Sequence, residues 1–577
     1  MKKTTACPLD CYDACEIVYD DGVLKGLKSG HTNGFLCPHL NHYEKHQIIT
    51  KPRYNGIEIS LEEAIVKLKE IIFLTQKSEI LHYRGSGNFA LMQEVTDHFF
   101  ASFGATLIDG TLCDGAGEAG IIQGRGSNKN MSIQEIAKSE VVIFWGRNPH
   151  TTSTHLLPLI KDKTIIVIDP LKTKIAKIAD LYIQIKPRGD KLLAMLLSRF
   201  LHIENGCDIE YLDEYASDYE EYYELTQSIR IKATLEQIDV TLGEVGAVLD
   251  LVRGKRVAIV CGVGIQKYSD GADIMRAIDA FAVMLGLFGK EGCGVAYLGE
   301  SKAGITSPFF RDAKRVSKVD TEFSDYKTLF VQGANPLSQM PDTLRVRKSM
   351  SGLQNVIYFG LHENETSEIA NLVIPAKSFL YKNDLRTSYS HNAMMLMPKV
   401  DERKSGISEY DLSAYLCREF NIEIEKEEFY IDHFKNFAIK KMDGVFYVES
   451  REEIPYQDGF DTKNGKFLFL EEFEIGMDTN EKFHLITPKS QTSLNSQFNR
   501  ENCVYLHNSL GFSEGEVVTI SSINGSVELR VKNSSDLRPD TIMIYSGTKG
   551  VNNLTTSKHS EDGKSAIFQE NRVEIKR

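Results

Sequence analysis

The stretch VVIFWGRNP, residues 141–149, and its near copy TLFVQGANP, residues 328–336, indicate the fold of this chain. Each is an apolar run of strand length that ends in the pattern Gly-x-Asn-Pro. Glycine lets the backbone approach a ligand closely, the asparagine amide can recognise a base or a phosphate, and proline stops the strand. The repeat predicts two nucleotide-binding halves, although strand-ending turns built from turn-favoured residues would give the same pattern.

Similar apolar runs recur through the middle of the chain and alternate with helical patterns. They end near Gly, Asn or Asp, and they fall at residues 79–83, 141–145, 164–168, 256–260, 328–331 and 356–359. This alternation is typical of βαβ units and predicts an α/β fold with parallel sheets. Ligands in such folds bind at the carboxyl ends of the strands, where these polar residues fall.

The C-terminal part has short alternating strands separated by turns, at residues 483–486, 516–520, 526–531 and 541–545. Asn524-Gly525 between two of them is a strong hairpin signal, and the pattern predicts a small β-barrel. We expect two interleaved α/β domains between a cysteine-rich head and this barrel. The expected boundaries are 1–53 for the head, 54–130 plus about 321–400 for one α/β domain, 131–320 for a Rossmann-like domain, 401–480 for a mixed region of uncertain assignment, and 481–577 for the barrel.

The composition is that of an ordinary globular chain: 577 residues, 42% hydrophobic and 25% charged. Its net charge of −13 argues against non-specific binding to nucleic acid or to anionic membranes. The N-terminal residues include no apolar stretch and no twin-arginine segment, and no run of 18 apolar residues occurs. We therefore expect a cytoplasmic protein that does not span a membrane.

Four of the ten cysteines crowd into the first 37 residues, as Cys7-x3-Cys11-x3-Cys15 followed by Cys37. Four thiolates are the number that a [4Fe–4S] cluster needs, and short spacings let three of them surround one side of a cubane. Structural zinc also takes four thiolates, but zinc ribbons usually bring them as two pairs. The spacing favours an iron–sulfur cluster over zinc and over unliganded cysteines.

With this head in front of the α/β strands, the chain resembles the catalytic subunits of the molybdopterin oxidoreductases, the family of dimethyl sulfoxide reductase, nitrate reductase and formate dehydrogenase. The resemblance covers nearly the whole chain and depends on several motifs in the right order. It implies one [4Fe–4S] cluster and a bis(molybdopterin guanine dinucleotide) cofactor with molybdenum or tungsten. It also implies two-electron redox chemistry on a small substrate, with electrons passed to a partner protein or iron–sulfur subunit.

The family presents the protein ligand of the metal on a loop after the first α/β segment, and residues 110–117, GTLCDGAG, match that loop. The resemblance makes Cys113 the metal ligand and catalytic residue, and a soft thiolate suits that role. Without the family context, a buried structural cysteine is the simpler interpretation of Cys113.

The turn YRGSGN, residues 83–88, resembles the family's turn beside the pterin, with Gly85, Ser86 and Gly87 as the binding residues. An NAD-type fingerprint is the alternative, with Asp109 as its acid. Further along, a strand-ending aspartate can accept two hydrogen bonds from guanine, and Asp190 can equally cap a helix that begins at Lys191. The other cofactor-binding residues that the resemblance implies are Asn148, Asp169, Asp190, Asn335, Glu365, Thr366, Thr487 and Asn553.

Two positions depart from the family pattern. His39 stands where many members have a lysine after the fourth cluster cysteine, and Asp114 stands where formate dehydrogenases have a histidine after the metal ligand. The second departure counts against formate as the substrate. Two rival functions remain: a metal-free iron–sulfur relay like the large subunit of respiratory complex I, and a non-redox tungsten hydratase in which Asp10 or Asp13 assists the addition of water.

Overall fold

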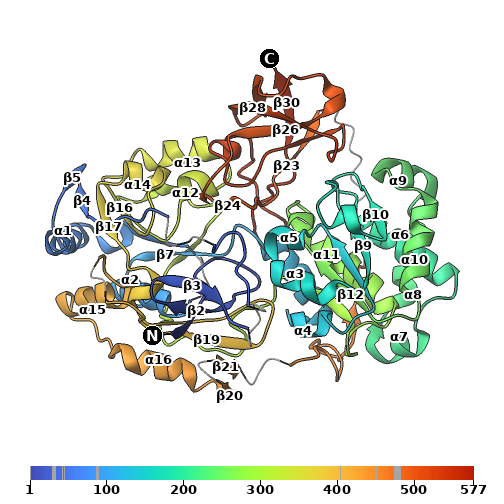
Figure 1. Cartoon of the computed structure of the whole chain (residues 1–577), viewed down its shortest axis with the longest axis horizontal. Coiled ribbons are helices and arrows are strands. Elements are labelled where there is room, and N and C mark those ends of the chain that lie inside the picture. The colour runs from blue at the N-terminus through green and yellow to red at the C-terminus, as the bar shows by residue number, and fades with distance from the viewer. Residues whose placement is uncertain are drawn as a thin grey trace.

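The computed structural model describes residues 2–577 apart from 29–33, 42, 44–45, 86–89, 403–404, 443–444, 449–451 and 474–481. Two α/β lobes lie side by side, and a β-barrel stands above the junction between them (Figure 1). The sheets of both lobes are largely parallel and the C-terminal barrel is closed. The fold class expected from the sequence is therefore confirmed.

The first lobe, at the left of Figure 1, contains an eight-stranded sheet in the order β14-β7-β6-β15-β16-β17-β4-β5. β6 pairs in parallel with β15, so segments far apart in the sequence share one sheet, which is the expected interleaving. β14 pairs with β7 and adds the residues from Arg315 onward to this lobe, slightly before the expected boundary at about 321. The strands are β4 (Arg53–Tyr54), β5 (Ile57–Glu58), β6 (Ile80–Arg84), β7 (Thr106–Asp109), β14 (Arg315–Ser317), β15 (Thr328–Gln332), β16 (Asn355–Gly360) and β17 (Leu372–Pro375).

Helices cover the first sheet, and their ends follow local sequence signals. The first helix begins at a capping box, in which the Ser60 hydroxyl accepts from the Glu63 N–H and the Glu63 carboxylate accepts from the Ser60 N–H. The second ends at Gly104, whose φ of +98° suits only glycine without strain. The helices are α1 (Leu61–Leu74), α2 (Val95–Phe103), α12 (Pro336–Gln339), α13 (Thr343–Met350), α14 (Glu365–Ile369), α15 (Glu409–Glu419) and α16 (Glu427–Lys435).

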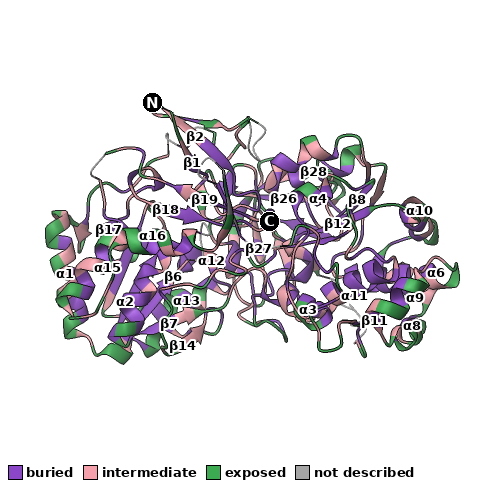
Figure 2. Ribbon diagram, turned by 90° about the horizontal axis from the view of Figure 1, so that it is seen from below, coloured by how far each residue is buried: buried purple, intermediate pink, exposed green. Residues whose placement is uncertain are grey.

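The second lobe is built on a five-stranded parallel sheet in the order β10-β9-β8-β12-β13. Every residue of β8 and β12 is buried, as expected for strands covered on both faces, and the strands of both lobes are largely buried in Figure 2. The strands are β8 (Val141–Trp145), β9 (Thr164–Ile168), β10 (Leu181–Ile183), β12 (Val257–Cys261) and β13 (Gly294–Ala296). The helices are α3 (Gly115–Arg125), α4 (Ile133–Ile136), α5 (Pro149–Thr152), α6 (Asp190–Ile203), α7 (Ile209–Tyr215), α8 (Tyr219–Gln227), α9 (Ile231–Ile238), α10 (Leu242–Val252) and α11 (Gly271–Met284).

The N-terminal head is a three-stranded antiparallel sheet of β1 (Lys3–Ala6), β2 (Glu16–Asp20) and β3 (Val23–Gly26). The loop between β1 and β2 carries three of the four clustered cysteines. It is closed at its base, where the Cys7 N–H donates to the Cys15 carbonyl oxygen at 2.7 Å. This short closed loop brings Cys7, Cys11 and Cys15 together.

The region 401–480, which the sequence pattern did not assign, is divided among its neighbours. α15 and α16 pack on the first lobe. β20 (Ala438–Met442) and β21 (Val445–Val448) extend a sheet begun by β18 (Asp384–Arg386) and β19 (Ala393–Met397), whereas β22 (Phe467–Leu468) pairs with β11 (Ala216–Ser217) in the second lobe. These partners lie far away in the sequence, so local patterns do not reveal them.

The closed barrel has the strand order β23-β29-β26-β28-β27-β30. The expected hairpin is present: Ser521 pairs with Ser526 across the turn that contains Asn524-Gly525. The strands are β23 (Phe483–Ile486), β26 (Cys503–His507), β27 (Val517–Ser521), β28 (Ser526–Ser534), β29 (Thr541–Met543) and β30 (Arg572–Lys576), and a separate hairpin consists of β24 (Ser493–Leu494) and β25 (Gln497–Phe498).

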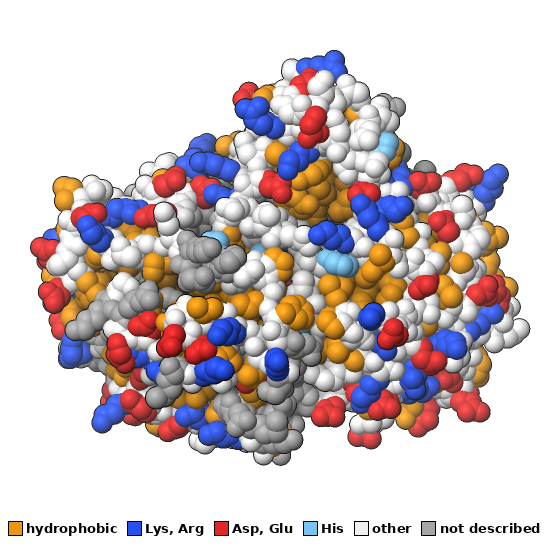
Figure 3. All heavy atoms as spheres, in the orientation of Figure 1, with side chains coloured by type: hydrophobic (Ala, Val, Ile, Leu, Met, Phe, Trp, Pro, Cys, Tyr) orange, Lys and Arg blue, Asp and Glu red, His pale blue; other side chains and the backbone are white. Residues whose placement is uncertain are grey.

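Charged side chains of both signs are interspersed on the face seen in Figure 3, without a broad basic patch. Within the described ranges, no helix combines the length and the apolar character that a bilayer-spanning segment needs.

Candidate functional site

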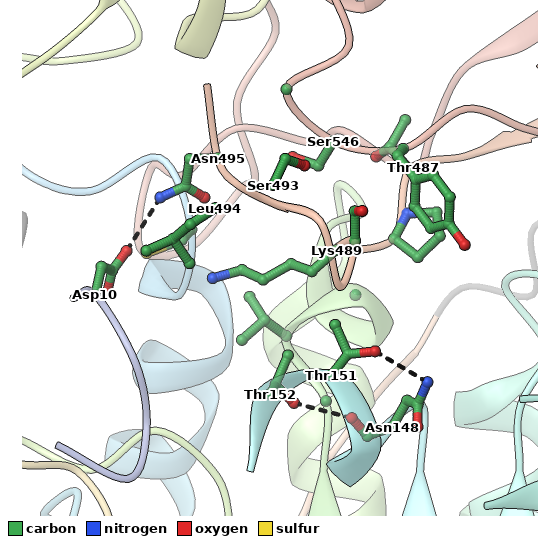
Figure 4. A pocket seen from close by; sticks show the side chains of 18 of the residues that line it. Asp10, Asn148, Thr151, Thr152, Thr487, Lys489, Ser493, Leu494, Asn495 and Ser546 are labelled. Carbon is green, nitrogen blue, oxygen red and sulfur yellow. Dashed lines mark hydrogen bonds between the residues drawn. The ribbon is translucent and has the colours of Figure 1, made fainter. Parts of the chain in front are cut away.

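A cavity of about 730 Å³ lies where the head, both lobes and the barrel meet. The carboxyl ends of β7, β8, β9 and β12 open into it, as expected for ligand sites in parallel sheets. From the barrel side, the loop after β23 enters the cavity, and Lys489 on this loop extends between Asp10 and the turn that holds Thr151 and Thr152 (Figure 4).

The four cysteines of the head all line this cavity, and none of them forms a disulfide. Burial raises the pKa of Cys7 to about 11 and the pKa values of Cys11 and Cys37 to about 12, with a further rise from neighbouring thiols. A metal centre would reverse this, because coordination favours the thiolate. Four converging soft donors fit an iron–sulfur cluster, as the spacing predicted, and they also fit zinc.

A histidine from the second lobe contacts the head beside these thiols. His155 Nδ1 lies 3.2 Å from Cys15 Sγ and 2.9 Å from Asp13 Oδ2, and its Nε2 lies 3.2 Å from the Phe35 carbonyl oxygen. The imidazole also stacks on the Phe35 ring, with centroids 4.4 Å apart. All three polar side chains are buried, so His155 fixes the position of Asp13 and reaches a cluster cysteine.

His39, at the position where many family members have lysine, contacts the barrel. Its Nε2 lies 3.1 Å from the carbonyl oxygens of both Ser490 and Ser493. Burial lowers the pKa of His39, which favours the neutral ring. The side chain therefore attaches the head to the loop that enters the cavity.

Cys113 lies on the cavity, on the loop between β7 and α3. Its Sγ is 3.0 Å from Thr111 Oγ1 and 3.1 Å from Asp114 Oδ1. Its carbonyl oxygen accepts from Gln266 Nε2 of the second lobe at 2.6 Å. Burial raises the pKa of the Cys113 thiol. Cys113 lines the same cavity as the four head cysteines, and its backbone carbonyl is held from the second lobe.

Asp169 directly follows β9 and Asp190 is the first residue of α6, and both line the cavity. Burial raises the pKa of Asp169 to about 7 and that of Asp190 to about 6. Asp169 accepts from the Leu171 N–H at 2.9 Å, and Asp190 accepts from the Trp145 indole at 2.7 Å. The expectation that Asp190 caps a helix is wrong, because α6 begins at Asp190 itself and its carboxylate bonds the buried indole instead.

Glycines bring the strand-ending loops into close contact. A Cβ on Gly262 would lie 1.7 Å from the Gly146 carbonyl oxygen, and a Cβ on Gly85 would lie 2.5 Å from that of Gly333. Gly85 lines the cavity, while Ser86 and Gly87 lie outside the described residues. The glycine of each Gly-x-Asn-Pro stretch therefore contacts the backbone of a neighbouring loop closely, although the asparagines of the two stretches differ in setting.

Asn148 and Thr487 also line the cavity. The Asn148 side chain is engaged in capping α5, since its Oδ1 accepts from the His150 N–H at 3.2 Å and its Nδ2 donates to Thr151 at 3.2 Å. Thr487 Oγ1 accepts from Gln569 Nε2 at 3.1 Å. These two residues lie where a cofactor would bind, but their polar groups already have protein partners.

Other expected binding residues do not line the described cavity. Asn335 donates to Glu365 at 2.8 Å and accepts from Thr366 at 2.8 Å, and the three side chains are buried against one another. Asn553 points to the Ser526 carbonyl oxygen, whereas its neighbour Asn552 lines the cavity. The expected turn therefore reaches the cavity through Asn552, and binding of a cofactor by Asn553 stays a prediction.

Comparison with known proteins agrees with this architecture. The pattern of the family described as molybdopterin oxidoreductase matches residues 64–419, and that of the molybdopterin dinucleotide binding domain matches residues 478–571. The chain belongs to the molybdopterin oxidoreductase family.

Relatives of this molybdopterin oxidoreductase include two proteins of Bacillus subtilis (strain 168). The probable oxidoreductase YyaE is 26% identical, over 81% of this chain and 77% of its own length. The probable oxidoreductase YoaE is 24% identical, over 99% of this chain and 98% of its own length. Among solved structures, acetylene hydratase from Pelobacter acetylenicus has the same fold, with a TM-score of 0.76 at 15% identity, covering 99% of this chain and 96% of that one.

The cavity of this family member fits the molybdopterin dinucleotide and the molybdenum or tungsten that the family uses. Glycines let the strand-ending loops that line the cavity pack backbone against backbone. Asp169 accepts a single hydrogen bond among the described residues, so its buried carboxyl group is suited to donors from a guanine base. The thiol of Cys113 supplies a soft donor near the centre.

Several residues around the site were not identified from the sequence: His155, Gln266, Lys267, Lys318 and Lys489. Gln266 and Lys267 follow Gly262-Val263-Gly264, a third glycine-rich strand end, and this pattern is the sequence signal that points to them. His155 lies 140 positions from its partner Cys15, and no local pattern connects the two.

Proposed function

We propose that this molybdopterin oxidoreductase uses bis(molybdopterin guanine dinucleotide) and one [4Fe–4S] cluster for two-electron redox of a small substrate, and that a partner protein exchanges the electrons. The observation that carries the proposal is the single cavity that joins four converging thiols, Cys113 and the two buried aspartates.

In this proposal Cys7, Cys11, Cys15 and Cys37 hold the cluster, and Cys113 is the protein ligand of molybdenum or tungsten. Asp169 and Asp190 bind guanine at the far end of one dinucleotide. The bound metal would supply the two-electron chemistry, and the protein holds, orients and tunes it. Cys37 is only half-buried, so a cluster at this position is close enough to the surface to exchange electrons with a partner.

Elemental analysis of the purified protein, combined with electron paramagnetic resonance (EPR) of the reduced form, tests this function. We expect iron at four atoms per chain, molybdenum or tungsten at one, and GMP released by acid hydrolysis. Iron without molybdenum or tungsten would favour the relay function instead. Zinc without iron would remove the cluster from the proposal.

Non-redox hydration is a second candidate, because Asp10 lines the cavity next to Cys11. Asp10 accepts from Asn495 Nδ2 at 3.2 Å (Figure 4), whereas Asp13 is already bound by His155. If an acid assists water addition, the geometry favours Asp10. Turnover of acetylene, the substrate named for the solved relative, without net electron transfer would support hydration, and turnover that consumes electrons from a reduced dye would support the oxidoreductase.

A further inference from the structure

Two lysines, one from each lobe, lie near enough to Cys113 to interact electrostatically with its side chain. Lys267 directly follows Gln266, the residue that donates to the Cys113 carbonyl oxygen. Lys318 directly follows β14, and its backbone N–H donates to the Asp109 carbonyl oxygen at 2.9 Å, at the base of the Cys113 loop. Both lysines line the cavity. The fold therefore brings two ammonium groups from separate lobes to the expected metal ligand.

Lys318 has an environment that is costly for a cation. Lys318 is buried, with 8% of its surface exposed, as is Lys191, with 4% exposed. Lys191 is paired with Asp270 at 2.6 Å and Asp273 at 3.5 Å. The ammonium group of Lys318 forms no hydrogen bond and no ion pair within the part of the chain that the structure describes. A buried charge without a partner is destabilising unless a ligand supplies the opposite charge.

Each of the two ammonium groups lies near an aromatic ring. Lys318 Nζ lies 5.6 Å from the centre of the Tyr83 ring, and Lys267 Nζ lies 4.8 Å from the centre of the Phe568 ring. Burial lowers the pKa of Lys318 to about 8 and also lowers that of Lys267. Cation–π contacts offset only part of the cost of removing an ammonium group from water.

The nearest charged groups have other partners. The Asp114 carboxylate accepts from Thr111 at 2.7 Å and lies 3.4 Å from the Tyr389 hydroxyl. Arg84, which adds positive charge near Lys318, is bound by Asp97 at 2.7 Å. The described protein therefore leaves positive charge beside Cys113 that is not paired.

We infer that the substrate is a small oxyanion that binds between Lys267 and Lys318, next to Cys113. This inference rests on the proposed function, because it assigns the substrate class of the same site. Ammonium groups bind oxyanions through charge-assisted hydrogen bonds, which are stronger than those to neutral oxides. A neutral N-oxide or S-oxide would leave both buried charges uncompensated.

Selenate is the probe for this site, because selenium can be located by anomalous scattering. Crystals of the holoenzyme soaked in sodium selenate should show a selenium peak within hydrogen-bonding distance of both Nζ atoms. Lys318→Met and Lys267→Met should each weaken selenate binding, measured by titration calorimetry, by tenfold or more. Lys290→Met is the matched control, since this lysine pairs with Asp208 at 2.9 Å on the surface. The selenate affinity of this variant should equal that of the parent.

Each outcome decides a separate question. No selenium peak at the two lysines, or unchanged affinity in both variants, overturns the inference. Variants that lose GMP or pterin would show that the lysines bind the cofactor, which also overturns it. A selenium peak in protein without molybdenum or tungsten would support an anion site while the proposed enzyme function fails. Faster turnover with trimethylamine N-oxide than with nitrate, selenate or chlorate would count against an oxyanion substrate.

Discussion

Cys113 is the residue on which the proposed enzyme function depends most. Cys113→Ser should leave the cluster and most of the pterin in place, because many loops from four parts of the molecule surround the cavity. An alkoxide is a harder donor than a thiolate, so the electronic properties of the metal should change and turnover should fall sharply. X-ray absorption at the metal edge should show one sulfur neighbour fewer and one oxygen neighbour more. Equal sulfur counts in parent and variant would make Cys113 a structural residue.

His155 provides a second test at the scale of single residues. If Cys15 is a cluster ligand, an N–H from His155 to its sulfur stabilises the reduced cluster, because hydrogen bonds to the sulfurs set the potential. His155→Phe should therefore move the cluster potential to a more negative value in an EPR-monitored redox titration. His202→Phe is the control, since this ring stacks on Tyr223 away from the cysteines. An unchanged potential with an intact cluster signal would show that His155 has no electronic role.

The raised pKa of Asp169 predicts that the stability of the protein prepared without cofactor depends on pH. Its pKa is about 7 in the folded chain against an ordinary 3.8, so the folded state binds the proton more tightly between these values. Stability from this group is therefore present at low pH and is lost as the pH rises through the window, by about 1.4 kcal/mol per pH unit.

Thermal unfolding of parent and Asp169→Asn from pH 4.5 to 8 measures this effect. The stability of the variant relative to the parent should increase as the pH rises, and this difference in stability should level off above pH 7. The subtraction removes groups common to both proteins, including Asp190, whose raised pKa acts in the same direction. Parallel stability curves would mean that Asp169 titrates at its ordinary pKa.

At the scale of elements, the loops that end β8 and β12 approach too closely for any side chain. Gly262→Ala should push the Gly146 backbone away and cost about 1–3 kcal/mol, the usual penalty for overpacking. Gly264→Ala, two positions later, is the matched control because a Cβ there meets nothing within 4 Å. Thermal unfolding should show a lower Tm for the first variant and a nearly unchanged Tm for the second. Equal Tm values would mean that the two loops can separate without cost.

The secondary-structure elements also show how much of the fold can be predicted from the sequence. β8 and β9 have the bounds expected from sequence, because buried parallel strands are continuous apolar runs that end at turn residues. β14 was not expected, since its three residues, Arg-Val-Ser, carry no apolar pattern. The position of Lys318 depends on β14 pairing with β7, and that pairing is a property of the tertiary structure. The same is true of Asn552 and Asn553, where turn geometry decides which side chain faces the cavity.

At the scale of the whole molecule, the cavity wall comes from four separate parts of the chain, so a ligand bound there links all of them. Ligands that bind only the folded state stabilise it by mass action. Protein purified from cells unable to make molybdopterin should therefore have a lower Tm than the holoenzyme. Limited proteolysis should also cut it faster in the loop that contains Lys489. Equal Tm values and equal cleavage rates would show that the four parts hold together without the cofactor.

The pairing of β6 with β15 has a consequence for biosynthesis on the ribosome. The five strands of the second lobe are all synthesised once Ala296 has left the ribosome. One edge of β6, however, has no partner until β15, residues 328–332, has been synthesised. Exposed strand edges of this kind can pair with other chains and cause aggregation. A chaperone that covers β6 and β7 during translation would prevent such pairing. The barrel strands follow both lobes in the sequence. The cavity, whose wall includes loops of the barrel, is therefore complete only after these strands have been translated.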